Sequence, residues 1–159
     1  IRNHIVRIDA DAFTETDASL IPTGKLIDVT GTPMDFRCEK AIGQDIDADY
    51  EPLQLAGGYD HNWVLNSHGK LQTAAEAYSP ETGIAMEVLT DLPGMQMYTG
   101  NGIGTEKGKE GKTYEKQTAV CFETQYFPDA VHHDNFEAPV CKGGEIYQTT
   151  TVYKFRIHE

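Results

Sequence analysis

The sequence predicts an all-β domain, and two observations support this fold class. Short apolar or alternating segments are separated by turns rich in glycine and proline, at the spacing typical of hairpins. No segment sustains an amphipathic helical period, and only residues 41–54 could contain one short helix. Many short strands of this kind indicate a sandwich or a barrel. With 159 residues the chain can bury one real core, so we expect a single domain over residues 1–159.

The expected strands follow from the local patterns in chain order. Residues 4–10 alternate between apolar and polar side chains, which is typical of a half-buried strand. Turn formers then fill residues 11–24, with a break at 22–24. Residues 100–114 contain five glycines and mixed charges, which predicts a mobile loop. The other expected strands are 25–29, 57–66, 71–78, 83–90, 94–98, 118–122 and 145–157.

The charge balance excludes one class of partner. The chain has 13 Lys and Arg against 25 Asp and Glu, a formal net charge of -12, which opposes binding to a phosphate backbone. We therefore expect no nucleic-acid partner. No run approaches the roughly 18 apolar residues that a membrane-spanning helix needs, so we expect no membrane partner either. Residues 45–51 resemble a calcium loop but lack its glycine and closing glutamate, and we interpret them as a solvated acidic loop.

The cysteines and histidines predict no metal site. Cys38, Cys121 and Cys141 form no CxxC pair and leave one odd thiol, so neither zinc nor a disulfide framework is expected. This pattern fits reduced surroundings such as the cytoplasm. The adjacent His132 and His133 could not easily both bind one ion without a third partner.

Residues 120–129 contain the first candidate for chemistry. An apolar run typical of a buried strand is interrupted by Glu123 and ends at Pro128, which cannot continue a ladder. Because cysteine, phenylalanine and tyrosine side chains flank Glu123, we expect this carboxylate to be partly desolvated, which suits a proton acceptor at neutral pH. The same stretch also fits a glutamate that faces solvent from an alternating strand.

Several segments together resemble the aldose 1-epimerase (galactose mutarotase) family. Residues 58–65 (GYDHNWVL), 92–101 (LPGMQMYTGN) and 122–130 (FETQYFPDA) occur in the order and approximate spacing of that family. Residues 10–14 with 20–24, 31–37 and 149–155 are also similar to its consensus. The resemblance covers almost the whole chain, and ordered matches are far more specific than any single one.

The resemblance implies a galactose mutarotase-like β-supersandwich, of which this chain is the C-terminal part. It also implies interconversion of the α and β anomers of a free hexose or pentose. In that reaction the anomeric hydroxyl loses a proton while the ring oxygen gains one, and the opened ring recloses from the other face. One base and one acid suffice, so the resemblance implies no metal and no organic cofactor.

Three residues match the functional positions of the family. Glu123 matches its general base, Asp60 the carboxylate that binds sugar hydroxyls, and Gln96 a substrate-binding amide. Carboxylates and amides suit this task because they accept from or donate to neighbouring hydroxyls. The aromatic Tyr59, Trp63 and Tyr98 either supply a face for the sugar or pack in the core, and the sequence leaves both readings open.

One departure from the family concerns the proton donor. In full-length relatives the general-acid histidine, a second histidine and a substrate-binding arginine precede the point that corresponds to Ile1, so we expect a trimmed or partial chain. His61 would point away from Asp60 in a regular strand, and we interpret it as structural. A sandwich without those strands would expose apolar surface. We therefore expect an N-terminal fragment of the same enzyme as a partner, or self-association.

Two other classes of function fit parts of the sequence. A non-catalytic carbohydrate-binding module could hold a sugar on the same aromatic and polar surface without turning it over. A purely structural interaction domain would have no need for Asp60, Gln96 and Glu123 together. The presence of all three favours the epimerase.

Overall fold

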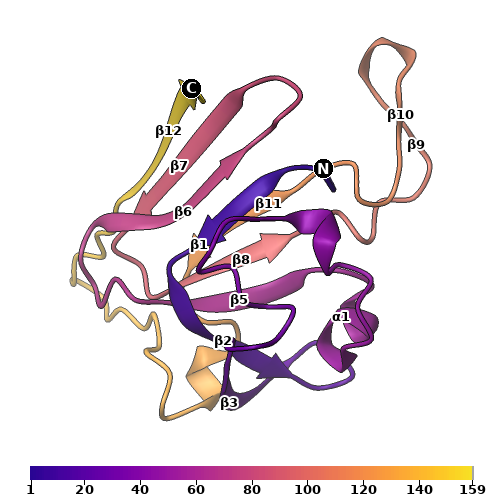
Figure 1. Ribbon diagram of the computed structural model, residues 1–159. Coiled ribbons are helices and arrows are strands. Elements are labelled where there is room, and N and C mark those ends of the chain that lie inside the picture. Colours follow the sequence, from indigo (N-terminus) through magenta and orange to yellow (C-terminus); the bar gives the residue numbers. More distant parts are fainter. Residues whose placement is uncertain (159) are drawn as a thin grey trace.

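The computed structural model describes residues 1–158 and contains two five-stranded antiparallel sheets (Figure 1). The first sheet has the order β12-β7-β6-β1-β4 and the second the order β11-β8-β5-β2-β3. The first consists of β1 (Ile5–Ile8), β4 (Lys40–Ala41), β6 (Gln72–Tyr78), β7 (Ile84–Thr90) and β12 (Thr151–Ile157). The second consists of β2 (Ala10–Thr16), β3 (Pro22–Asp28), β5 (Asp60–Leu65), β8 (Gly94–Tyr98) and β11 (Cys121–Gln125).

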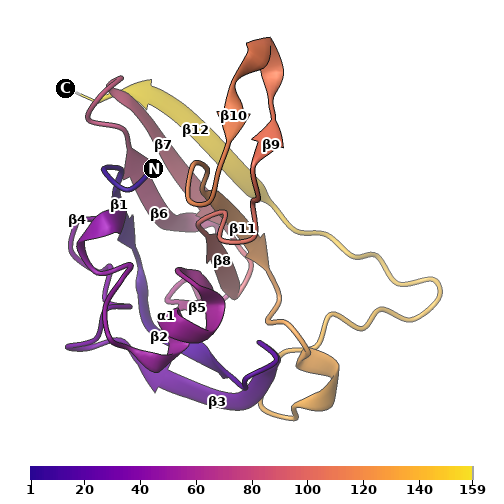
Figure 2. The ribbon, with the colours of Figure 1, turned by 90° about the vertical axis from the view of Figure 1, so that its right-hand side faces the viewer.

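The helical elements are short and lie outside the sheets. The single α-helix in residues 1–158, α1 (Glu51–Ala56), has a proline in its first turn and ends at Gly57, whose left-handed φ of 68° favours glycine. The other helical segments are 3₁₀ turns, namely η1 (Ile42–Gln44), η2 (Lys109–Gly111) and η3 (Ala130–His132). The hairpin of β9 (Glu106–Lys107) and β10 (Thr113–Tyr114) projects from the rest of the molecule (Figure 2).

Both sheets contribute to one apolar core. Val6 and Ile8 of the first sheet and Phe13, Trp63 and Met97 of the second are fully or almost fully buried in the same cluster. The chain passes between the sheets at Asp9, whose backbone bonds to residues on both sides. Because side chains alternate along a strand, the residues between these core positions face away from the core.

The structure confirms the predicted all-β class and revises several boundaries. Residues 11–24 were expected to be turns, but β2 continues to Thr16 because Phe13 and Thr14 are buried against β5. The turn itself is confined to residues 17–21, where the Asp17 carboxylate accepts from two backbone N–H groups. The expected loop at residues 100–114 contains the β9–β10 hairpin. The last strand starts at Thr151 instead of residue 145.

Strands β7 and β12 carry a band of exposed apolar side chains. Beside this band the edge strands β11 and β12 meet, where the Tyr153 hydroxyl donates to the Phe122 carbonyl at 2.8 Å. On β12, Phe155 and Ile157 are 67% and 70% exposed, and their partners in β7 are Met86 and Ile84. Their face of the sheet is the inner one, because Tyr153 lies opposite the buried Val88. We call Ile84, Tyr153, Phe155 and Ile157 the apolar strip.

Candidate active site

Three neighbouring strands bring the predicted site residues onto one face of the second sheet. Gln96 of β8 lies opposite Asn62 of β5 on one side and opposite Glu123 of β11 on the other. Asp60 is two residues from Asn62 and therefore shares its face. The structure thus gathers all three predicted residues on the face that points away from the core.

Asp60 and Gln96 are in direct contact. The Gln96 Nε2 donates to Asp60 Oδ1 at 2.8 Å, and both side chains are partly buried. The thiol of Cys121 lies on the same face, since Cys121 is paired with Tyr98 and Tyr98 with Asp60. Burial raises the pKa of this thiol, and the negative charges of Glu123 and Asp60 raise it further. Both carboxylates are therefore close to the same thiol.

Glu123 is exposed, so the expectation of a partly desolvated carboxylate is wrong for this chain. The physical reason is its position on an edge strand. In β11 the apolar Phe122 points to the core and is 7% exposed, whereas Glu123 points to the outer face. Phe127 does not cover Glu123 but turns away to pack edge-on against Phe136, with ring centres 5.0 Å apart.

Two further amides, which were not predicted, join this site. Gln125 Nε2 donates to Gln96 Oε1 at 3.2 Å and to Asn62 Oδ1 at 3.1 Å. Asn62 is only 2% exposed. We call Asn62, Gln96 and Gln125 the amide cluster. Strand alternation was the available signal, because Asn62 and Gln125 each lie two residues from a predicted site residue.

His61 lies on the opposite face of β5 and confirms its structural interpretation. Its ring is 1% exposed and packs edge-on against Phe13 and Trp63. His61 Nδ1 accepts the Asp60 backbone N–H at 3.0 Å. Burial lowers the pKa of His61 to about 4, which the Pro52 backbone only partly opposes. His61 therefore supports the site from behind as a neutral imidazole.

Comparison with known proteins identifies the family. The family model described as aldose 1-epimerase matches residues 1–154. This chain belongs to the aldose 1-epimerase family. Over 158 residues it is 39% identical to the galactose mutarotase of Bos taurus, 38% to that of Homo sapiens and 32% to the aldose 1-epimerase of Escherichia coli. These alignments cover 98–99% of this chain but 45% of each relative, so the chain spans less than half of their length.

Solved structures agree with this assignment. A GalM/aldose epimerase homologue from C. elegans superposes with a TM-score of 0.86 and 26% identity, over 100% of this chain and 47% of that one. The galactose 1-epimerase from Lactobacillus acidophilus gives 0.84 and 25%, over 99% and 45%. These findings confirm the predicted family and its galactose mutarotase-like fold, of which this chain is a part.

In this epimerase-family chain, two of the three candidate aromatic platforms belong to the core. Tyr59 and Trp63 are fully buried on the side of β5 opposite to Asp60. Trp63 Nε1 donates to the Met34 carbonyl and the Tyr59 hydroxyl to the Pro33 carbonyl, both at 3.0 Å. Burial raises the pKa of Tyr59. Only Tyr98 shares the face of the site, where its hydroxyl accepts the Gly102 N–H at 2.9 Å.

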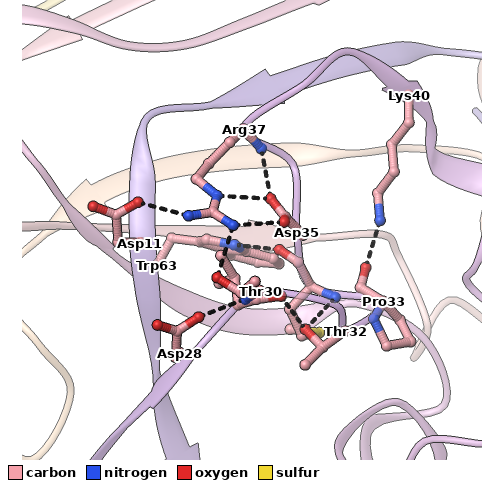
Figure 3. A network of polar contacts seen from close by, with 11 residues as sticks. Asp11, Asp28, Thr30, Thr32, Pro33, Asp35, Arg37, Lys40 and Trp63 are labelled. Atoms are coloured by element: carbon pink, nitrogen blue, oxygen red, sulfur yellow. Dashed lines mark hydrogen bonds and ion pairs between the residues drawn. The ribbon is translucent and has the colours of Figure 1, made fainter.

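The family motif at residues 31–37 holds β5 in place from behind (Figure 3). Arg37 donates to Asp35 at 2.7 Å, to Asp11 at 3.1 Å and to Thr30 at 2.9 Å. The Arg37 guanidinium holds the pKa of the Asp35 carboxyl below its usual range. This network shapes the loop that presents the Met34 carbonyl to Trp63. The motif therefore acts on the site indirectly, through the core face of β5.

Other candidate positions do not form a second site. Both adjacent histidines contact Asp129, His133 Nε2 at 3.5 Å, and His133 also bonds to the Pro22 carbonyl at 3.0 Å. Within residues 1–158 no group of three or more metal-binding side chains is found, and no helix is long and apolar enough to cross a membrane. The three cysteines are free and exposed.

Proposed function

We propose that this chain carries the catalytic base of an aldose 1-epimerase that interconverts the α and β anomers of a free hexose or pentose. One observation supports this most strongly: Asp60, Gln96 and Glu123 come from three adjacent strands and share one face. Family membership adds support, because the relatives are named galactose mutarotase and aldose 1-epimerase. Since those relatives are about twice as long, the activity belongs to the whole protein.

In the proposed reaction Glu123 takes the proton from the anomeric hydroxyl. The electrons of that O–H bond form the carbonyl, the bond from the anomeric carbon to the ring oxygen breaks, and an acid protonates the ring oxygen. Rotation about the bond between C1 and C2 followed by the reverse steps gives the other anomer. An exposed carboxylate on an edge strand is accessible to a sugar, and sugar binding would then displace water around it.

Asp60 and Gln96 would hold the sugar during this exchange. Their mutual hydrogen bond uses one carboxylate oxygen and one amide proton. A second carboxylate oxygen and a second N–H remain, which can accept from and donate to neighbouring hydroxyls. The acid that serves the ring oxygen would come from outside this group, since His61 faces the core on the other side of β5.

We infer that the partner of this chain is the polypeptide that corresponds to the upstream half of its relatives. The apolar strip supports this inference, because exposed inner-face side chains next to two edge strands are an unfavourable surface in water. The length of the relatives supplies a segment of suitable size to cover it. The competing interpretation is that a second copy of this chain covers the apolar strip. Determining which polypeptides the native complex contains distinguishes the two.

Replacement of the proposed base tests the function. Glu123→Gln keeps the shape and removes the proton acceptor, so we expect mutarotation in the native protein to slow by about 10²- to 10⁴-fold while sugar affinity changes little. Polarimetry of freshly dissolved α-anomer measures the rate. Glu39→Gln is the matched control, because Glu39 is an exposed glutamate directly before β4 of the first sheet and has no assigned role. Equal rates for wild type and Glu123→Gln would refute the assignment.

A further inference from the structure

The amide cluster lies directly beside the proposed sugar site and has a defined hydrogen-bond order. Gln125 Nε2 donates to two acceptors, Gln96 Oε1 and Asn62 Oδ1, at 3.2 and 3.1 Å. Gln96 in turn donates to Asp60 at 2.8 Å. Gln125 and Asp60 therefore bond to opposite ends of the same Gln96 amide.

The charge of Asp60 determines the direction of every bond in this chain of contacts. A carboxylate can only accept hydrogen bonds, so Gln96 must turn its NH₂ group toward Asp60 and its carbonyl toward Gln125. Gln125 must then present its NH₂ group to Gln96. The second proton of that NH₂ group goes to Asn62 Oδ1. If either glutamine amide rotated by 180°, two donors or two acceptors would face each other.

The cluster is also sterically enclosed. A Cβ at position 94 would lie 2.5 Å from Asn62 Oδ1 and 2.9 Å from the Phe127 ring, so only glycine fits there. Asn62 Nδ2 is buried and has no hydrogen-bond partner among the described residues. A buried donor without a partner costs roughly 1–3 kcal/mol. An apolar residue would avoid this cost, so packing alone does not explain an asparagine at this position.

We propose that Gln125 and Asn62 are positioning residues that hold the Gln96 amide with its NH₂ group toward Asp60. In this orientation the pair offers the sugar one N–H from Gln96 and one free oxygen from Asp60. That pattern fits two neighbouring hydroxyls, one acting as acceptor and the other as donor. The role rests on the proposed function, since it concerns the recognition of a monosaccharide at the same site.

Gln125→Glu is the informative variant, because it nearly keeps the volume but reverses the hydrogen-bond demand. The new carboxylate can only accept, so Gln96 would lie between two carboxylates with a single NH₂ group to share. Asn62 Nδ2 could rotate toward the new carboxylate, which offsets the lost bond from Gln125. We therefore expect the melting temperature to change little, KM to rise about tenfold and kcat to change less.

A second substitution distinguishes positioning from packing. In the Asp60→Asn, Gln125→Glu double variant one carboxylate remains, at the other end of Gln96, so all bonds can run in the reverse direction. The side-chain amide resonances of Gln96, measured by heteronuclear NMR of the native protein, should shift in Gln125→Glu and become a single ordered pair again in the double variant. Sugar binding stays weak in the double variant because the charged acceptor at position 60 is lost and Gln96 turns its NH₂ group away from that position.

The outcomes separate this inference from the proposed function. Unchanged Gln96 resonances and unchanged KM in Gln125→Glu would overturn the positioning role, even if Glu123→Gln abolishes activity. If Gln125→Glu lowers the melting temperature and the second substitution restores nothing, the role is packing and the proposal also fails. If the protein shows no mutarotation, the NMR comparison with sugar titration still tests the proposal. Gln148→Glu, at an exposed loop position, controls for the added charge.

Discussion

The buried His61 predicts a loss of stability in mildly acidic solution. Its imidazole is 1% exposed between Phe13 and Trp63, and its Nδ1 accepts the Asp60 N–H. The ring proton is therefore on Nε2. Protonation would place a second proton on Nδ1, break the bond from Asp60 and leave a charge in the core. Protonation of His61 is therefore unfavourable in the folded protein but not in the unfolded chain.

The magnitude follows from the pKa. Burial lowers the pKa of His61 from 6.5 to about 4, so the unfolded state takes up a proton at a higher pH than the folded state. The free energy of unfolding is thus unaffected above the unfolded pKa and decreases as pH falls toward the folded pKa. Between pH 7.5 and pH 5 this linkage amounts to about 2 kcal/mol, and it reaches about 3 kcal/mol near pH 4.

Denaturant unfolding of the native protein at several pH values between 7.5 and 5 measures this decrease. His61→Leu removes the titrating group, so the variant should lose most of the slope whatever its absolute stability. Carboxyls with lowered pKa, such as Glu87 and Asp35, lose their contribution only at lower pH and do not affect this window. His4 also has a lowered pKa and accounts for part of the slope that remains. Equal slopes for wild type and His61→Leu would refute the reasoning.

Two further predictions concern Gly94 and the apolar strip. Gly94→Ala would drive a methyl group into Asn62, so we expect a loss of about 1–3 kcal/mol in unfolding free energy together with weaker sugar binding; Gly143→Ala, which meets no atom within 4 Å, should change stability by less than about 0.5 kcal/mol. Phe155→Ser should weaken association through the apolar strip about tenfold or more by analytical ultracentrifugation, whereas the similarly exposed Val140→Ser should not. A compact, stable monomer of this chain with nothing bound would contradict the partner inference.

Strand alternation is the part of the site that the sequence predicts well. The patterns around Asp60 and Gln96 indicated regular strands, and both residues lie on the same face in contact with each other. The same rule placed His61 on the opposite face, where the structure has it. These positions depend only on the local geometry of a strand, in which successive side chains point to opposite faces. The alternation of residue types in the sequence follows this geometry directly.

The exposure of Glu123 could not be predicted, because it depends on the order of the strands. The residues around it are apolar, but their side chains turn to the core or pack on one another, as Phe122 and Phe127 do. Whether a strand is central or at an edge is decided by distant pairings, here those of β11 with β8 alone among the described strands. The extension of β2 to Thr16 was missed for a similar reason, since tertiary burial of Phe13 and Thr14 outweighs the local turn formers.

Strand β5 shows how stability and function can share one segment. Its core-facing Trp63 is held by the loop at residues 31–37 and packs against His61, and its outer Asp60 and Asn62 enter the hydrogen bonds of the site. Because the two sets alternate along one backbone, any shift of the core face moves the site face by the same distance. Substitutions at odd positions of β5 should therefore lower both stability and sugar binding, whereas a change at Asp60 should affect binding alone.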